Sequence, residues 1–306
     1  MAQAEKIGIA LSGGGAKGAF QAGALRWLKE QGYSYHAVAG VSVGALNGAF
    51  VAARKVVALH TIWERITQSD VYRKKKWYEL AWEFAKWKMG IGGPVDAVYD
   101  NGALAELIAR NIMPSDIKLA LEIGRVDIDT GKYHSGLYGH DVAKFHKVLL
   151  ASTSIPVVWP PVRIENEPFV DGGLVNIAPL ADLIDNGCDR IIAITTEPLG
   201  FKRSLVTNDL FNIARKSIGI LTHEVFINDI KSVENVNNLV GQAQSKGIQL
   251  RKPGSDRYYR HIDIDVITPE TPIGSGLDFS RRHLNNLLSL GYEAAQNALG
   301  ANIYEK

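Results

Sequence analysis

The sequence predicts an α/β protein, a three-layer α/β/α sandwich built around a mainly parallel central sheet. Three observations carry this prediction. Short apolar runs alternate with longer amphipathic runs along most of the 306 residues, as strands and crossover helices do. The first apolar run leads into a glycine-rich turn and then a helix. The second leads into a Gly-x-Ser-x-Gly segment over 40–44, and such turns occupy the C-terminal ends of parallel strands. A single domain over 1–306 accounts for the length.

The expected elements follow from the spacing of the apolar residues. Short apolar runs predict strands over 6–12, 36–41, 118–128, 132–137, 162–170, 189–196 and 260–267. Apolar residues at helical spacing predict helices over 17–31, 43–67, 102–111, 141–151, 176–186, 206–239 and 278–299. Asp278 and Ser280 supply N-cap side chains for the last of these helices.

Ser42 stands at the centre of a predicted nucleophile elbow over 40–44. In such an elbow the serine occupies a tight turn between a strand and a helix, with its hydroxyl exposed. The turn is crowded, so Gly40 and Gly44 are needed where a Cβ would clash. The flanks fit, because a short apolar strand precedes the turn and a helix of small residues follows it. A glycine-rich packing turn without chemistry is the alternative interpretation.

A second glycine-rich segment, Gly-Gly-Gly-Ala-Lys-Gly over 13–18, opens the first helix. Backbone N–H groups that enter a helix with little side chain around them are suited to hold a negative charge. We therefore expect an oxyanion hole formed by Gly13, Gly14, Gly15 and Gly18. Lys17 either adds positive potential there or is a solvated helix lysine. The same spacing also matches a dinucleotide fingerprint, but that fingerprint needs an acidic residue at the end of the next strand, where 39–42 holds none.

Asp171 is the candidate base for Ser42. Eight histidines are present, and none stands in a context typical of a catalytic triad. Asp171 follows an apolar strand end, and Gly172 and Gly173 let the backbone turn sharply and leave the carboxylate uncrowded. An Asp at its ordinary pKa of about 4 is a weak base, but burial raises that pKa. An ordinary surface turn is the alternative interpretation of Asp-Gly-Gly.

Together these segments resemble the patatin-like phospholipases, which are serine acyl hydrolases with a Ser–Asp dyad and no catalytic histidine. The family pattern is Gly-Gly-Gly-x-[Lys/Arg]-Gly, Gly-x-Ser-x-Gly, a proline-bearing block and Asp-Gly-[Gly/Ala]. Here the four motifs stand intact and in order at 13–18, 40–44, 151–156 and 171–173. The resemblance implies Ser42 as the nucleophile, Asp171 as the base and an oxyanion hole in the backbone around Gly14 and Gly15. It weakens after about residue 200.

The activity that the resemblance implies is hydrolysis of carboxylic esters in phospholipids or related lipids through a covalent acyl-enzyme. A transacylase or a general carboxylesterase would use the same dyad. Two interpretations that assign the chain no acyl-transfer activity stay open. They are a dinucleotide-binding module and a catalytically silent lipid-binding protein. No cofactor and no metal is expected, because no His, Cys or carboxylate cluster has ligand spacing.

The composition indicates which partners and which cellular location to expect. A net charge of +2 indicates no particular partner, and we expect no nucleic acid among the partners. The single cysteine, Cys188, excludes an intramolecular disulfide and fits a reducing compartment. The first residues have no pattern of a secretory signal, and no run of about 18 apolar residues is present. We expect a cytoplasmic protein that is soluble or peripheral to a membrane.

The segment over 71–99 differs in composition from its surroundings. It holds half of the six tryptophans among a cluster of lysines, namely Trp77, Trp82 and Trp87 with Lys74, Lys75 and Lys76. On a helix over 71–90 the aromatic residues cover a broad face and the acidic residues a narrow one. Such a basic, aromatic helix suits an anionic membrane surface. The alternative is a cap or lid helix that packs its tryptophans on the core, and both interpretations place it near the acyl site.

Overall fold

The computed structural model describes residues 5–93, 97–136, 141–200 and 210–300, and at 210–219, 221 and 222 it describes the backbone alone. The end of the strand predicted over 132–137 and the start of the helix predicted over 206–239 lie outside the described residues. Residues 94–96 of the predicted insertion and His140 lie outside them as well.

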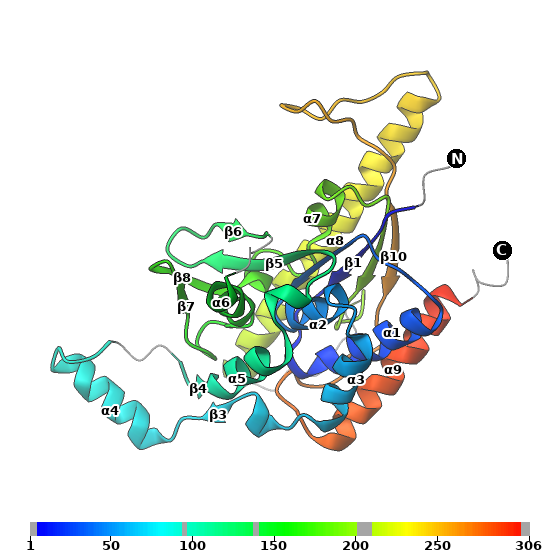
Figure 1. Ribbon diagram of the computed structural model, residues 1–306. Helices are drawn as coiled ribbons and strands as arrows, with labels where there is room; N and C mark the ends of the chain where they lie inside the picture. Colours follow the sequence, from blue (N-terminus) through cyan, green and yellow to red (C-terminus); the bar gives the residue numbers. More distant parts are fainter. Residues whose placement is uncertain (1–4, 94–96, 137–140, 201–209, 301–306) are drawn as a thin grey trace.

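A mixed sheet forms the centre of the described chain, in the order β10-β9-β1-β2-β5-β8-β7 with β6 paired to β5 (Figure 1). Its strands are β1 (Ile7–Leu11), β2 (Ala37–Val41), β5 (Ala120–Asp127), β6 (Tyr133–His134), β7 (Val162–Ile164), β8 (Glu167–Asp171), β9 (Arg190–Ile194) and β10 (Asp263–Ile267). The strands from β10 to β5 are parallel, whereas β6, β7 and β8 run antiparallel to their neighbours. The predicted, mainly parallel sheet is confirmed.

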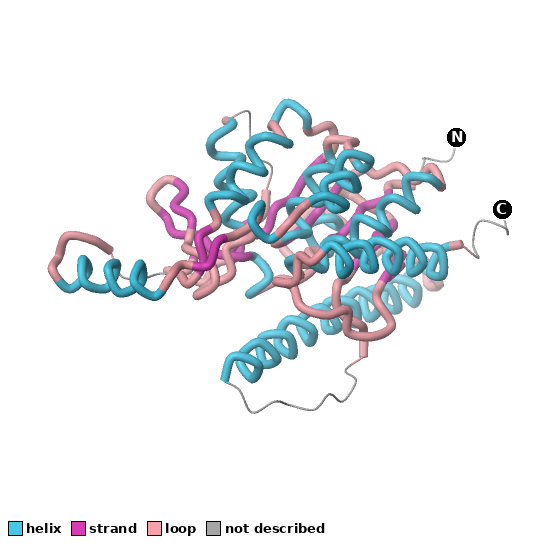
Figure 2. The backbone as a smooth tube through the Cα atoms, turned by 90° about the horizontal axis from the view of Figure 1, so that it is seen from below, coloured by secondary structure: helices cyan, strands magenta, loops and turns pink. Residues whose placement is uncertain are grey.

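Helices cover both faces of the sheet. They are α1 (Gly18–Glu30), α2 (Val43–Ala52), α3 (Val56–Arg65), α4 (Trp77–Lys88), α5 (Gly102–Asn111), α6 (Val142–Ser152), α7 (Leu180–Asp185), α8 (Leu210–Gln244) and α9 (Arg281–Leu299), with 3-10 turns η1 (Gly15–Lys17), η2 (Gln68–Asp70), η3 (Pro114–Asp116) and η4 (Gly172–Leu174). Successive side chains of a strand point to opposite faces. Ile9 and Leu11 join a core with α1, α2, α3, α5, α6 and α9, whereas Ala10 joins a second core with α7 and α8. The long helix α8 runs along one side of the strands (Figure 2), so the predicted three layers are present.

The helix predicted over 43–67 is two helices. Arg54, with φ 58°, takes the left-handed conformation that ends α2, and Lys55 N–H donates to the Phe50 carbonyl oxygen at 2.8 Å. Glycine is the usual residue at such a helix end, and its absence here hides the break in the sequence. The interruption lets α3 turn away from α2, so that the two helices form adjacent walls beside Ser42.

Two further predicted elements are wrong in extent. The strand predicted over 162–170 is the hairpin β7–β8, because Glu165 and Asn166 both have positive φ, as a tight two-residue hairpin turn requires. The helix predicted over 176–186 begins only at Leu180, because Pro179 disfavours helical backbone at the residue before it. The shorter helix leaves residues 175–179 as a loop that follows Asp171.

The segment over 71–99 does not begin as a helix. Arg73 and Lys74 form β3, which pairs antiparallel with β4 (Tyr99–Asp100), and α4 follows this ribbon. α4 projects from the rest of the molecule (Figure 1), and none of its residues is buried. Trp77 is 80% exposed, so the tryptophans do not pack on the core. Within the described part of the chain, no helix combines the length and apolar character needed to cross a bilayer.

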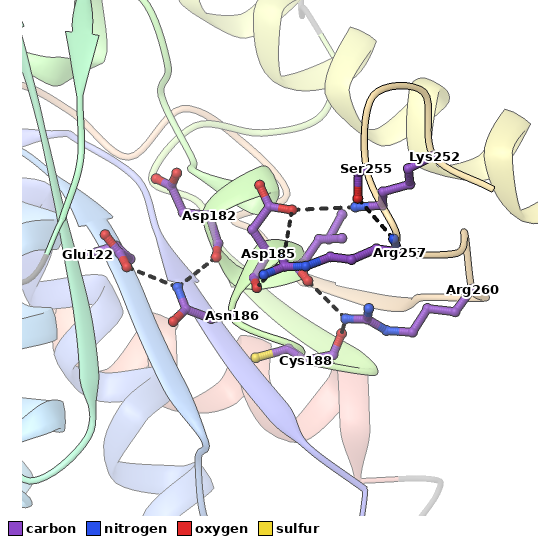
Figure 3. Close-up of polar contacts among 10 residues, drawn as sticks. Glu122, Asp182, Asp185, Asn186, Cys188, Lys252, Ser255, Arg257 and Arg260 are labelled. Atoms are coloured by element: carbon purple, nitrogen blue, oxygen red, sulfur yellow. Dashed lines mark hydrogen bonds and ion pairs between the residues drawn. The ribbon is translucent and has the colours of Figure 1, made fainter.

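Polar contacts fasten the loop over 251–260 to the end of α7 (Figure 3). Arg260 Nη2 donates to the carbonyl oxygens of Ile184 and Cys188 at 2.9 Å each, a favourable place for a cation because it is the C-terminal end of a helix. Lys252 Nζ lies 3.4 Å from a carboxylate oxygen of Asp185. The Cys188 side chain is buried, and burial raises the pKa of its thiol to about 11, so this single cysteine is chemically inert.

Candidate active site

Ser42 occupies the turn between β2 and α2. Its φ of 55° is unusual for a residue with a side chain and is the strain expected at a nucleophile elbow. A Cβ at Gly40 would overlap the carbonyl oxygen of Gly44, and a Cβ at Gly44 would overlap that of Leu11. The elbow therefore needs both glycines, and Ser42 begins α2 with its own carbonyl oxygen accepting from Ala45 N–H at 3.0 Å.

Asp171 reaches Ser42 through the register of the sheet. Val41 of β2 pairs with Gly124 of β5, and the next residue of β5, Arg125, pairs with Asp171 at the end of β8. The side chain of Asp171 is almost entirely buried and lies close enough to the Ser42 hydroxyl for the two groups to interact. Burial raises the pKa of the carboxyl to about 7, although the interaction with the Ser42 hydroxyl and the hydrogen bond from the Gly173 N–H oppose the rise.

The proline-bearing block over 151–156 holds both residues in place. Ser152 Oγ accepts from the Ser42 N–H at 2.9 Å and donates to the Gly124 carbonyl oxygen at 2.6 Å. Two residues later, the Ser154 carbonyl oxygen accepts from the Asp171 N–H at 3.0 Å. The sequence shows the motif but does not predict that Ser152 and Ser154 position the site. That role depends on where the end of α6 lies relative to β5.

The glycine-rich loop lies against Ser42. A Cβ at Gly13 would lie 3.2 Å from Ser42 Cβ and 3.8 Å from its Oγ. Within the described residues, the N–H groups of Gly13, Gly14 and Gly15 donate no hydrogen bond, whereas the Gly18 N–H donates back to the Gly15 carbonyl oxygen. Gly18 instead allows close packing, because a Cβ there would overlap Val43. Of the four glycines proposed for the hole, Gly13, Gly14 and Gly15 keep N–H groups available to an oxyanion, and Gly18 does not.

Two segments distant in sequence fix the shape of this loop. Thr196 Oγ1 donates to the Gly13 carbonyl oxygen at 2.6 Å, and the Thr196 N–H donates to Ser12 Oγ at 3.1 Å. On the other side, the Ala16 N–H donates to the Gly276 carbonyl oxygen at 2.7 Å. Thr196 and Gly276 are functional candidates that sequence reasoning missed, because neither stands in a recognisable motif.

Lys17 is buried and forms an ion pair with Glu197, which follows Thr196. The expectation of a solvated helix lysine is therefore wrong. The ion pair joins the start of α1 to the segment that follows β9. Thr196, in the same segment, holds the glycine-rich loop just before α1. Lys17 is therefore not free in solvent, and its ion pair helps to hold the glycine-rich loop in place.

An apolar pocket of about 710 Å³, its open mouth included, lies beside Ser42. Side chains of α2, α3 and α5 form most of its wall, and Val71, Trp159 and Phe279 are among the residues that contribute the rest. Asn47 also faces the pocket, but its amide is occupied by the Gly18 carbonyl oxygen, by the side chain of Gln21 and by the indole N–H of Trp63. The wall therefore offers few free polar groups to a ligand.

No histidine takes part in these contacts. Among the described residues, Ser42 hydrogen-bonds to Ser152 and to the first turn of α2, and Asp171 hydrogen-bonds to Ser154 and Gly173. The described part of the chain also holds no group of three or more His, Cys, Asp or Glu side chains arranged to bind a metal ion. The tryptophans and lysines of the segment over 71–99 do not join the site either.

The chain is similar to known proteins over most of its length. The family model described as patatin-like phospholipase matches residues 9–184, more than half of the chain. Patatin-like phospholipase domain-containing protein 7 of Mus musculus is 26% identical over 190 residues, 61% of this chain and 13% of that protein. Lysophospholipase NTE1 of Saccharomyces cerevisiae is 24% identical over 301 residues, 93% of this chain and 17% of that protein.

Among solved structures, VipD from Legionella pneumophila is 14% identical with a TM-score of 0.45, over 98% of this chain and 67% of that one. The chain spans less than a fifth of the length of either curated relative. The matched range over 9–184 contains Ser42, Asp171, the glycine-rich loop and the block over 151–156. On this match, the chain belongs to the patatin-like phospholipase family.

Proposed function

We propose that this chain is a lipid acyl hydrolase in which Ser42 is the nucleophile and Asp171 its base. The observation that carries the proposal is the place of the Ser42 side chain, which lines an apolar pocket and interacts with the buried carboxylate of Asp171. A serine hydroxyl becomes an effective nucleophile when a positioned base takes its proton. Membership of the family supports a lipid ester as the substrate, and a pocket with so few free polar groups suits an acyl chain.

In the proposed reaction, Ser42 Oγ attacks the ester carbonyl carbon and its proton passes to Asp171. The carbonyl oxygen becomes an oxyanion and accepts hydrogen bonds from the N–H groups of Gly14 and Gly15. When the tetrahedral intermediate collapses, the alkoxide leaves with the proton from Asp171, and the acyl group remains on Ser42. Water then attacks the acyl-enzyme, gives a proton to Asp171, and releases the fatty acid as that proton returns to Ser42.

The acyl pocket is tested by a series of p-nitrophenyl esters of increasing chain length. Each methylene buried in an apolar site contributes about 0.8 kcal/mol, close to a fourfold gain in kcat/KM. The variant Leu107→Trp places a large ring in the pocket, so kcat/KM for dodecanoate esters should fall at least about tenfold while butyrate changes little.

Glu106→Trp is the matched control for this series, because Glu106 is an exposed neighbour on the same helix and does not line the pocket. Equal losses on short and long esters in Leu107→Trp would contradict the assignment of the pocket to the acyl chain. Product analysis in the same series separates hydrolysis, which releases free fatty acid, from transfer of the acyl group to an added alcohol.

The pH dependence of the reaction should report Asp171. The base must be a carboxylate, and its pKa lies at about 7, so kcat/KM should rise through an apparent pKa near 7 and fall about tenfold per pH unit below it. A serine hydrolase assay from pH 5 to pH 9 on a soluble ester measures this profile. A profile that stays flat down to pH 5 would show that a group with an ordinary carboxyl pKa is the base.

The same pKa has a consequence for stability. Between about pH 4 and pH 7 the folded protein holds a proton on Asp171 that the unfolded chain has lost, so the free energy of unfolding falls as the pH rises through this window. Asp171→Asn has no carboxyl proton to release, so its free energy of unfolding should not fall with pH in this way. We expect the variant to melt at a higher temperature than the wild type at pH 8, and the difference to shrink toward pH 4.

A further inference from the structure

Helix α4 presents its apolar face away from the protein. Glu79 and Glu83 stand on its narrow polar side, and both point at the ribbon, where Glu79 pairs with Arg73 at 2.8 Å and Glu83 with Lys75 at 3.0 Å. Glu79 also accepts from the Lys76 N–H at 2.6 Å, which fixes the start of the helix. A helix that covers a core does the opposite, since it buries its apolar stripe and exposes its charges.

The exposed face is broad and aromatic. It includes the described side chains of Trp77, Tyr78, Trp82, Phe84 and Trp87, which are between 41% and 80% exposed, and it continues into Met89 and Ile91 just beyond the helix. A continuous exposed surface of this kind marks an interaction site, and Trp and Tyr are the side chains that favour the boundary between water and lipid.

The cations around this face remain available for a partner. Arg73 and Lys75 are neutralised by the two glutamates, but Lys74, Lys76, Lys86 and Lys88 form no ion pair with any described residue. Lys88 Nζ lies 4.7 Å from the ring centre of Trp87 and Lys76 Nζ 5.6 Å from that of Tyr78, so the charges sit among the rings. Their partner should therefore be both apolar and negatively charged.

Both ends of the ribbon run directly into the walls of the pocket. Val71 lines the pocket two residues before β3 begins, and α5, whose Leu104 and Ile108 line it, begins two residues after β4 ends. Between them Tyr72 packs edge-on against Tyr99, with ring centres 5.0 Å apart, and its hydroxyl donates to the Leu277 carbonyl oxygen at 2.9 Å. The ribbon thus attaches α4 firmly to the rim of the pocket.

We propose that α4 lies in the interface of an anionic lipid bilayer and holds the mouth of the pocket at the membrane surface. The aromatic face enters the boundary between headgroups and acyl chains, and the four unpaired lysines contact anionic headgroups. The binding itself is independent of catalysis, whereas the delivery of a lipid to Ser42 rests on the proposed function.

The test uses the wild-type protein and vesicles of ether-linked lipids, which contain no carboxylic ester for the enzyme to hydrolyse. Co-sedimentation is measured with phosphatidylcholine alone and with roughly a third phosphatidylglycerol, at low and at high salt. We expect binding that is at least about tenfold stronger with the anionic lipid and weaker at high salt. Tryptophan emission should shift to the blue, and that shift must come from α4, because Trp27, Trp63 and Trp159 are already buried.

Two sets of variants separate the rings from the charges. Trp77→Ser with Trp82→Ser should lower vesicle binding at least about tenfold, whereas Leu239→Ser with Tyr258→Ser removes exposed apolar side chains elsewhere and should not. Lys74→Gln, Lys76→Gln and Lys88→Gln together should lower it roughly 100-fold, at about fivefold per lysine. The matched control for charge is Lys29→Gln, Lys147→Gln and Lys246→Gln, three exposed lysines with no ion pair to a described residue.

Several outcomes would overturn the proposal. Vesicle binding that survives the Trp77 and Trp82 replacements would place the contact elsewhere on the molecule. The wild-type protein could instead fail to bind vesicles and form a dimer in light scattering that the same replacements convert to a monomer. That result would show that the aromatic face of α4 contacts a second copy of the chain. Hydrolysis of a soluble short-chain ester should be unchanged in all these variants, so loss of vesicle binding and failure of the hydrolase assignment are distinguished.

Discussion

Replacing Ser42 by alanine should lower kcat on a soluble short-chain ester by about 10³-fold or more. In the proposed mechanism the alanine removes the oxygen that forms the acyl-enzyme, while the backbone N–H groups of the glycine-rich loop stay in place and leave a residual rate. Asp171→Asn should cost a similar factor, because an amide cannot take the proton of the hydroxyl. The double variant should lose little beyond either single one, since the two residues act as a unit.

A matched control for these variants is Ser289→Ala, which removes one exposed hydroxyl from α9 far from the elbow. Circular dichroism and thermal melting should show that Ser42→Ala and Asp171→Asn remain folded. Turnover close to the wild-type rate in folded Ser42→Ala would mean that another residue is the nucleophile.

A methyl group at Gly15 should lower kcat about 100-fold, with a smaller change in KM. The added Cβ would overlap the carbonyl oxygen of Gly276, and the φ of +60° at this position is strained for any residue with a side chain. The loop must shift to relieve the overlap, which moves the N–H donors away from the developing oxyanion. Steady-state kinetics of Gly15→Ala on the same short-chain ester measures both constants.

Gly32→Ala is the matched control for Gly15→Ala. Gly32 has a φ of +79°, so the backbone strain is comparable, but no atom lies within 4 Å of the added Cβ. Thr196→Val is a milder second variant, because it keeps the volume of the side chain and removes the hydrogen bond to the Gly13 carbonyl oxygen. An unchanged kcat in both Gly15→Ala and Thr196→Val would remove this loop from the reaction.

The positions of the elbow and of the proposed base are the parts of the candidate site that the sequence predicts best. Ser42 and Asp171 stand in short motifs whose glycines are required by local sterics, so a local pattern carries the information. The residues that position them are set by distant contacts instead. Ser152 hydrogen-bonds both to the Ser42 N–H and to Gly124 of β5, and Thr196 hydrogen-bonds to Gly13 across 183 residues. Nothing local in the sequence marks either contact.

The sequence also does not predict two features of the helices, namely the break between α2 and α3 and the orientation of α4. Arg54 ends α2 in a left-handed conformation that glycine usually takes, so the sequence shows a continuous helix where the structure has two. The amphipathic character of α4 is visible in the sequence, but its orientation is not. Periodicity defines an apolar face without saying which way it points, and the ion pairs from Glu79 and Glu83 to the ribbon decide that it points outward.

Covalent labelling with a fluorophosphonate tests the Ser–Asp dyad most directly. The probe transfers its phosphonyl group to an activated serine and releases fluoride, and peptide mass spectrometry locates the adduct. We predict a single adduct on Ser42, abolished by Ser42→Ala, strongly slowed by Asp171→Asn and retained when each of the eight histidines is replaced by Gln in turn. An adduct on another serine, or a folded histidine variant that no longer labels, would contradict the dyad.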